Sequence, residues 1–222
     1  MTKRRQPVET KEPKWSKILY VTSNAAMVNG LFLLCCIPLV TIGQAWAGLY
    51  GAVRFGIRGD GWFSGFKTGF KTRFLRGTLA WTACLLMITD TTLNLFAVIG
   101  ENMVMTVLYS LFLLLATMIC AALIPLNVYI PSSVSQWLKN AVNLVMYAPF
   151  RALGAAAMMW LPTVLVILYL KFAFFDPFFF IMVFLLIYHT FGTLVATILL
   201  KSPLIRIKQE TEQLQEGEAN WA

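Results

Sequence analysis

The chain has 222 residues, of which 59% are hydrophobic and 13% are charged, and its formal net charge is +8. Soluble domains contain roughly 45–50% apolar and about 25% charged residues. The mean hydropathy of +0.71 therefore excludes an ordinary soluble domain, and the length leaves room for one membrane bundle. The basic residues flank apolar stretches and form no folded surface of their own, so we expect no nucleic-acid partner.

A long apolar region follows the basic segment 1–17 and would measure about 54 Å as a single helix, against a bilayer core of about 30 Å. Proline and glycine interrupt it near its middle, where a helix is expected to break. We therefore predict a broken helical hairpin over 18–57. Its turn contains Pro38, Thr41 and Gly43.

Four further apolar runs are long enough to cross a bilayer, where only helices satisfy their own backbone groups. These predicted spans cover 77–99, 103–128, 152–170 and 177–200. Two amphipathic segments, 62–76 and 132–148, are predicted to lie at the cytoplasmic interface. The fold class is thus all-α: a polytopic bundle with a single transmembrane domain over 18–200, five long apolar segments and six helices, followed by a cytoplasmic tail over 201–222.

Lys and Arg residues gather in particular segments of the chain, with six in 1–17 and six in 54–76. The positive-inside rule places these segments in the cytoplasm, together with the connection 129–151 and the C-terminal tail. Both termini are then cytoplasmic in a multi-pass protein. Five crossings with the N-terminus outside remain the alternative.

One amphipathic segment carries aromatic and basic residues at regular spacing. Phe66, Phe70 and Phe74 recur every four residues and share a helix face, with Lys67 and Lys71 beside it. Such a face suits the headgroup region of an anionic bilayer. Packing of the same helix against the bundle is the alternative, and the two interpretations are compatible.

Four short blocks of sequence stand out: Ile37–Gly43, Ala47–Tyr50, Arg58–Asp60 and the phenylalanine and lysine series over 66–74. Together they resemble the YesL-like family of bacterial membrane proteins, a domain of unknown function. Gln44 departs from the family, where many members have proline. Genes of this family often stand near sugar-uptake transporters and polysaccharide-degrading enzymes. The resemblance therefore implies a protein of the bacterial plasma membrane linked to carbohydrate use, and it brings no established catalytic residue.

Two ionisable residues fall inside predicted spans, where such groups are costly and often functional. Asp90 and His189 lie at depths that differ by about 5 Å at the helical rise per residue, so their side chains are candidates to meet. Asn94 and Thr193 follow them by four residues on the same faces. An Asp–His pair can relay protons or bind a cation or a sugar hydroxyl. The alternative is hydrogen bonding that fixes helix packing.

Motifs for a phosphate loop, a zinc protease helix and a nucleophile elbow are all missing from the sequence. The chain has one histidine, and its four cysteines fall within apolar runs as packing residues. We therefore expect no enzyme activity, cofactor or metal. Two functions stay open: an accessory or regulatory component that assembles with a sugar transporter or another membrane protein, and a small transporter or channel for a sugar, ion or metabolite that uses Asp90 and His189. A homo-oligomer is compatible with both.

Overall fold

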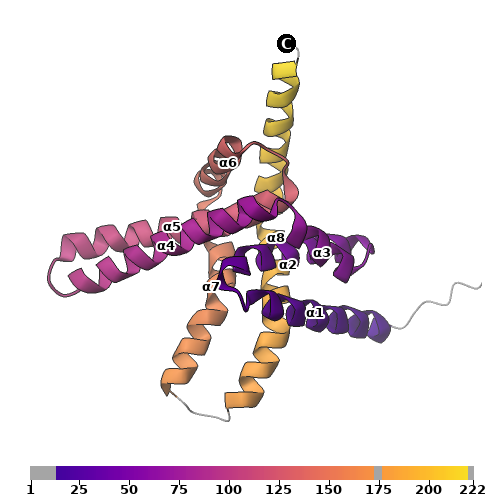
Figure 1. The fold of residues 1–222 in the computed structure, drawn as a ribbon, viewed down its shortest axis with the longest axis horizontal. Coiled ribbons are helices and arrows are strands. Elements are labelled where there is room, and N and C mark those ends of the chain that lie inside the picture. The colour runs from indigo at the N-terminus through magenta and orange to yellow at the C-terminus, as the bar shows by residue number, and fades with distance from the viewer. Residues whose placement is uncertain (1–13, 173–176, 220–222) are drawn as a thin grey trace, which may run out of the picture.

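The computed structural model describes residues 14–172 and 177–219, with side chains at 15–16, 18–161 and 188–213. Every regular element within these ranges is helical, which confirms the predicted all-α class. In chain order the elements are α1 (Lys14–Cys36), the 3-10 turn η1 (Leu39–Thr41), α2 (Ile42–Arg58), α3 (Trp62–Lys71), α4 (Phe74–Val98), α5 (Met103–Tyr129), α6 (Val134–Tyr147), α7 (Pro149–Phe172) and α8 (Pro177–Ala219) (Figure 1).

The short helix α2 lies at the centre of the fold. All its residues from Gly43 to Val53 are buried, and it contacts α1, α3, α4, α5 and α8. A helix surrounded on all sides needs small residues where its neighbours come closest. The buried stretch supplies Gly43, Ala45, Ala47, Gly48, Gly51 and Ala52.

A break separates α1 from α2 over residues 37–41. Pro38 precedes the turn η1, and a proline cannot continue the hydrogen-bond ladder of a helix. The hydroxyl of Thr41 donates to the carbonyl oxygens of Cys35 and Pro38. These bonds give a hydrogen-bond donor to one carbonyl in the last turn of α1 and to one carbonyl in the break itself.

Two helical hairpins extend from the central body. Figure 1 shows the α4–α5 hairpin and the α7–α8 hairpin leaving the body in different directions. Gly100, with a φ of 86°, and Asn102 form the tip of the first hairpin. The Asn102 side chain accepts a hydrogen bond of 3.1 Å from the amide of Met105 and so caps α5.

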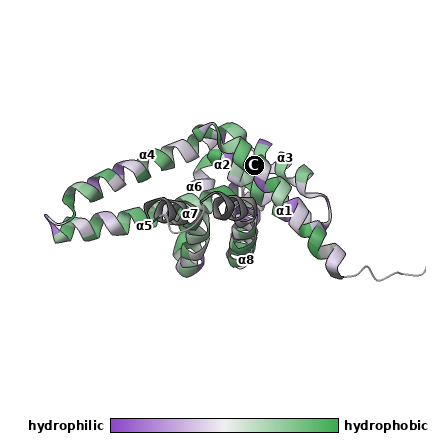
Figure 2. Cartoon of the chain, turned by 90° about the horizontal axis from the view of Figure 1, so that it is seen from below, coloured by the Kyte–Doolittle hydropathy of each residue, from purple (hydrophilic) through white to green (hydrophobic). Residues whose placement is uncertain are grey.

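Four of the described helical segments are long and apolar enough to cross a membrane. They are Ile18–Cys36, Phe74–Val98, Met103–Tyr129 and Tyr188–Gln213. A fifth is added if Val134–Tyr147 and Pro149–Leu161, which meet at 108°, count as one broken span. Large apolar side chains are exposed along α1, α4 and α5, and Figure 2 shows many hydrophobic residues, in green, along α4 and α5. Such surfaces are compatible with contact to a lipid bilayer.

Helix α8 does not end near residue 200, where the apolar run ends. It continues through Pro203 to Ala219 and is 43 residues long. The reason lies in packing against α6: Leu204 and Ile207 are buried, and Thr211 on the same face accepts a hydrogen bond of 3.2 Å from Asn140. The segment 201–219 is therefore part of a packed helix.

Candidate functional site

The structure does not bring Asp90 and His189 together. Asp90 is exposed on α4, which packs on α5 and α2, and its backbone carbonyl accepts a bond of 2.9 Å from the side chain of Asn94. His189 is buried on α8 against aromatic rings of α1 and α2. The candidate Asp–His pair is therefore not formed in the structure, because similar depth along two helices does not make them neighbours.

His189 lies among aromatic side chains from three helices. Its ring centroid is 4.7 Å from that of Phe32, 5.6 Å from that of Trp46 and 6.2 Å from that of Tyr188. Thr193 is fully buried, and its hydroxyl donates to the carbonyl of His189 at 2.7 Å. Thr193 thus bonds to the backbone of its own helix. The ring of His189 serves as a contact surface between α8 and the α1–α2 hairpin.

A buried polar contact beside His189 ties α1 to α8. The side-chain oxygen of Asn29 accepts hydrogen bonds from the amide of Thr190 at 3.0 Å and from its hydroxyl at 2.6 Å. The same hydroxyl lies 3.3 Å from the carbonyl of Ala25. The sequence indicates Asn29 only as a polar residue of the hairpin, because its partner lies 161 positions away.

Replacement of Asn29 by alanine is expected to lower the stability of the protein by about 1–3 kcal/mol, because the buried amide of Thr190 loses this acceptor and the hydroxyl keeps only the carbonyl of Ala25. Asn24→Ala is the matched control, since Asn24 bonds locally to the carbonyl of Tyr20. Thermal unfolding in mild detergent measures both variants. Equal melting temperatures for the two would contradict a role for Asn29 in holding α1 to α8.

Helices α2 and α3 approach through glycines on both sides. A Cβ atom on Gly51 would collide with the carbonyl oxygen of Gly65, and one on Gly69 would collide with that of Ala47. Gly65 and Gly69 are spaced as in the small-xxx-small motif of close helix pairs. This spacing is a signal from which the contact could have been predicted.

The aromatic residues of the predicted interfacial face pack in a row, but they do not share one helix over 62–76: Phe66 and Phe70 lie on α3, and Phe74 begins α4 after the break at Thr72 and Arg73. Phe66 is buried and stacks on Phe70 with centroids 6.1 Å apart, and Phe70 lies 5.5 Å from Phe74. Lys67 and Lys71 are exposed beside the row. The inner end of the face therefore belongs to the helix-packing core, and the lysines and the 40% exposed Phe74 are its accessible part.

Arginines bind the backbone at the C-terminal end of α5. Arg54 donates to the carbonyl of Val128 at 3.4 Å, and Arg76 donates to that of Ser132 at 2.7 Å. Arg73 donates to two carbonyls, those of Asn127 at 3.1 Å and Ile130 at 3.0 Å. We call Arg54, Arg73 and Arg76 the arginine clamp. The last carbonyls of a helix have no partner within it, and cations there also favour the helix dipole.

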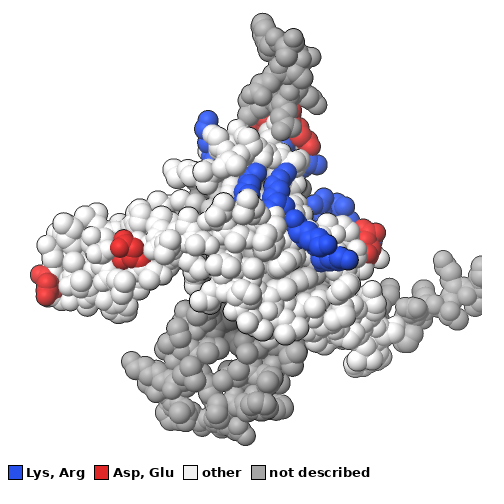
Figure 3. Space-filling model, viewed as in Figure 1, with Lys and Arg blue, Asp and Glu red and all other residues white. Residues whose placement is uncertain are grey.

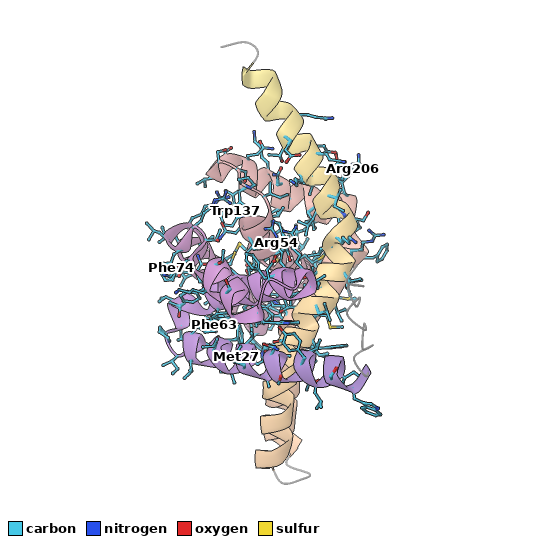
Figure 4. The ribbon with its side chains drawn as sticks, turned by 90° about the vertical axis from the view of Figure 1, so that its right-hand side faces the viewer. Met27, Arg54, Phe63, Phe74, Trp137 and Arg206 are labelled. Carbon is cyan, nitrogen blue, oxygen red and sulfur yellow. The ribbon has the colours of Figure 1, made fainter. Side chains whose placement is uncertain are left out.

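Aromatic rings hold two arginines of the clamp in place. The guanidinium of Arg76 lies 4.1 Å from the ring centroid of Trp137, whose indole nitrogen donates to the carbonyl of Leu123 at 3.0 Å. Arg54 lies 5.3 Å from the ring centroid of Tyr129. Figure 4 shows Arg54 and Trp137 at the level where the helices converge. The clamp thereby connects α2, α4, α5 and α6.

Two buried amides fix the break between α3 and α4. Gln44 donates to the carbonyls of Arg73 at 3.2 Å and Phe74 at 2.6 Å, and Asn127 donates to that of Thr72 at 3.4 Å. Arg73 has a φ of 46°, a left-handed conformation that costs a non-glycine residue about 1–2 kcal/mol. The surrounding hydrogen bonds offset that cost.

A cavity of about 20 Å³ lies between α2, α4 and α5, next to these amides. Trp81, Cys84, Cys120 and Asn127 are among its lining residues. This volume matches about one water molecule and is too small for a sugar. In the described residues, no group of three or more His, Cys, Asp or Glu side chains is placed to hold a metal ion.

The positive charge around the clamp has little acidic compensation. The two ion pairs in the described part of the chain both lie on α8, between Arg206 and Glu210 and between Lys208 and Glu212. Figure 3 shows Lys and Arg side chains running across the body over α3 and the start of α4. This basic surface adjoins the ends of the apolar helices α4 and α5.

Together, the apolar helices and their exposed surfaces define a protein of the polytopic helical membrane class. Residues 25–95 match a family described as "Protein of unknown function, DUF624". The matched segment runs from α1 to α4 and includes the whole of α2 and α3. No curated protein matches the chain, and no solved structure matches it.

Proposed function

We propose that the protein is an accessory membrane component that binds another membrane protein through its basic surface. The exposed Lys67 and Lys71, beside a clamp whose arginines have no carboxylate partner among the described residues, carry this proposal. Uncompensated charge at the edge of a bundle favours an acidic partner surface. The YesL-like resemblance supports a sugar transporter as that partner and the bacterial plasma membrane as the location.

The proposed topology places the basic surface in the cytoplasm, together with both termini, by the positive-inside rule. A transporter that uses Asp90 and His189 has less support, because the two residues lie apart. The cavity between α2, α4 and α5 is also too small for a sugar.

Affinity purification after cross-linking in cells that grow on a sugar tests the proposal. We expect a transporter subunit to co-purify with the wild type, and Lys67→Glu with Lys71→Glu to reduce its yield about tenfold or more by charge repulsion. Asp90→Asn with His189→Ala serves as the matched double variant and should retain the partner. Loss of sugar uptake in that control, with the folded protein still present, would favour the transporter instead.

A further inference from the structure

A second, larger cavity opens between α2, α3 and the end of α5. Its volume is about 230 Å³. Arg54 and Arg58, one turn apart on α2, line one side. Thr68 on α3 and Thr72, the residue that follows the end of α3, line the other. Gly69 is also among the lining residues, and the close approach of α2 and α3 there brings the two polar rows toward each other. The helix contact thus shapes the pocket.

The two arginines of this pocket differ in what holds them. Arg54 is fixed by the carbonyl of Val128 and the ring of Tyr129. Arg58 is exposed, and it has no hydrogen-bond or ion-pair partner in the part of the chain that the structure describes. A guanidinium offers five donors in a planar fork. Most of the donors of this pair are therefore available to a ligand.

The threonines add polar groups of suitable chemistry. The hydroxyl of Thr72 donates to the carbonyl of Thr68 at 2.7 Å, which leaves its oxygen as an acceptor. The hydroxyl of Thr68 is exposed and has no partner within the described ranges. It can donate to an anion that lies between the two arginines.

Charge and position point to the same kind of ligand. The segment 54–76 has six basic residues and one acidic residue, Asp60. The pocket lies where α5 ends at Tyr129 and close to where α4 begins at Phe74. Both helices are long and apolar enough to cross a membrane, so their ends lie at the depth of lipid headgroups.

We propose that this pocket binds a phosphate group, which Arg54 and Arg58 contact by charge-assisted hydrogen bonds and Thr68 by its hydroxyl. Paired guanidinium groups match the oxygens of a phosphate. Basic pockets between membrane helices on the cytoplasmic side are typical sites for anionic lipid headgroups. A soluble phosphate ion offers the same chemistry, and the two sources are separated by experiment.

The test uses the full-length protein in neutral detergent. Phosphatidylglycerol, phosphatidylcholine and inorganic phosphate are titrated separately, and the melting temperature and the lipids retained in native mass spectrometry are recorded. We expect phosphatidylglycerol to raise the melting temperature and to remain bound, while phosphatidylcholine does neither. The same shift with inorganic phosphate alone would support the pocket and assign it to a soluble ligand.

Arg58→Gln is the informative variant, because it removes a charge from the pocket without removing a described contact. The apparent affinity of this variant for the phosphate compound that stabilises the wild type should fall about fivefold, as expected for one basic residue at a lipid surface. Lys67→Gln removes the same charge from an exposed residue outside the pocket lining and should bind like the wild type. Equal losses in both variants would overturn the proposal in favour of diffuse surface charge. The proposal would also be overturned if neither phosphatidylglycerol nor inorganic phosphate changed the melting temperature. Equal stabilisation by polyglutamate, titrated in the same way, would overturn it as well.

Discussion

Gly69→Ala is expected to destabilise the protein by about 3 kcal/mol, the upper end of the usual cost of overpacking. The added methyl would collide with the carbonyl oxygen of Ala47, which is backbone and cannot rotate away. The two helices would have to separate, and α2 is the element around which five other helices pack. Thermal unfolding and size-exclusion profiles in mild detergent measure the loss.

Gly30→Ala is the control for that substitution. Gly30 also lies inside a helix, and a Cβ there would meet no atom within 4 Å. The control should be neutral or slightly stabilising, because alanine has the higher helix propensity. If Gly69→Ala melts at the temperature of Gly30→Ala, the close contact between α2 and α3 does not exist in the native protein.

Arg73→Met is expected to cost about 3 kcal/mol, because charge-assisted bonds to the carbonyls of Asn127 and Ile130 are lost while the left-handed backbone of residue 73 remains. Arg73→Gly loses the same bonds, but it removes roughly 1 kcal/mol of backbone strain. We therefore expect glycine to be the milder substitution. Denaturation curves in detergent give the order of the two.

Lys71→Met controls for the loss of one positive charge, since Lys71 is exposed near the same turn. It should leave the unfolding curve unchanged. A curve for Arg73→Met that coincides with that of Lys71→Met would show that the arginine clamp contributes no stability. A glycine variant less stable than the methionine variant would refute the role of strain.

The helical class follows directly from the sequence, because apolar runs of this length have few other solutions in a bilayer. Pro38 similarly indicates where the long N-terminal region breaks. Hydropathy does not show that α2 is central, because burial by protein and burial by lipid select the same residues. The glycine spacing at 65 and 69 is the local signal that distinguishes burial by protein from burial by lipid. It predicts that another helix packs closely at these glycines, but it does not identify that helix.

The arginine clamp could not be predicted from the sequence. The positive-inside rule already accounts for the positive charge of Arg54, Arg73 and Arg76. The neighbouring sequence does not distinguish an arginine that only sets the topology from one that also caps a distant helix. Their acceptors lie more than 50 positions along the chain. Asp90 and His189 illustrate the same limit: the sequence gives their depth, whereas helix packing decides which residues become neighbours.

The length of α8 has a mechanical consequence. Its 43 residues extend for about 64 Å, roughly twice the thickness of a bilayer core. Thr190 on this helix is bonded to α1, and Thr211, about 31 Å further along, is bonded to α6. Because α8 connects these two contacts, a tilt of α6 that moves Thr211 would also displace the contact between Thr190 and Asn29 at the other end of the helix.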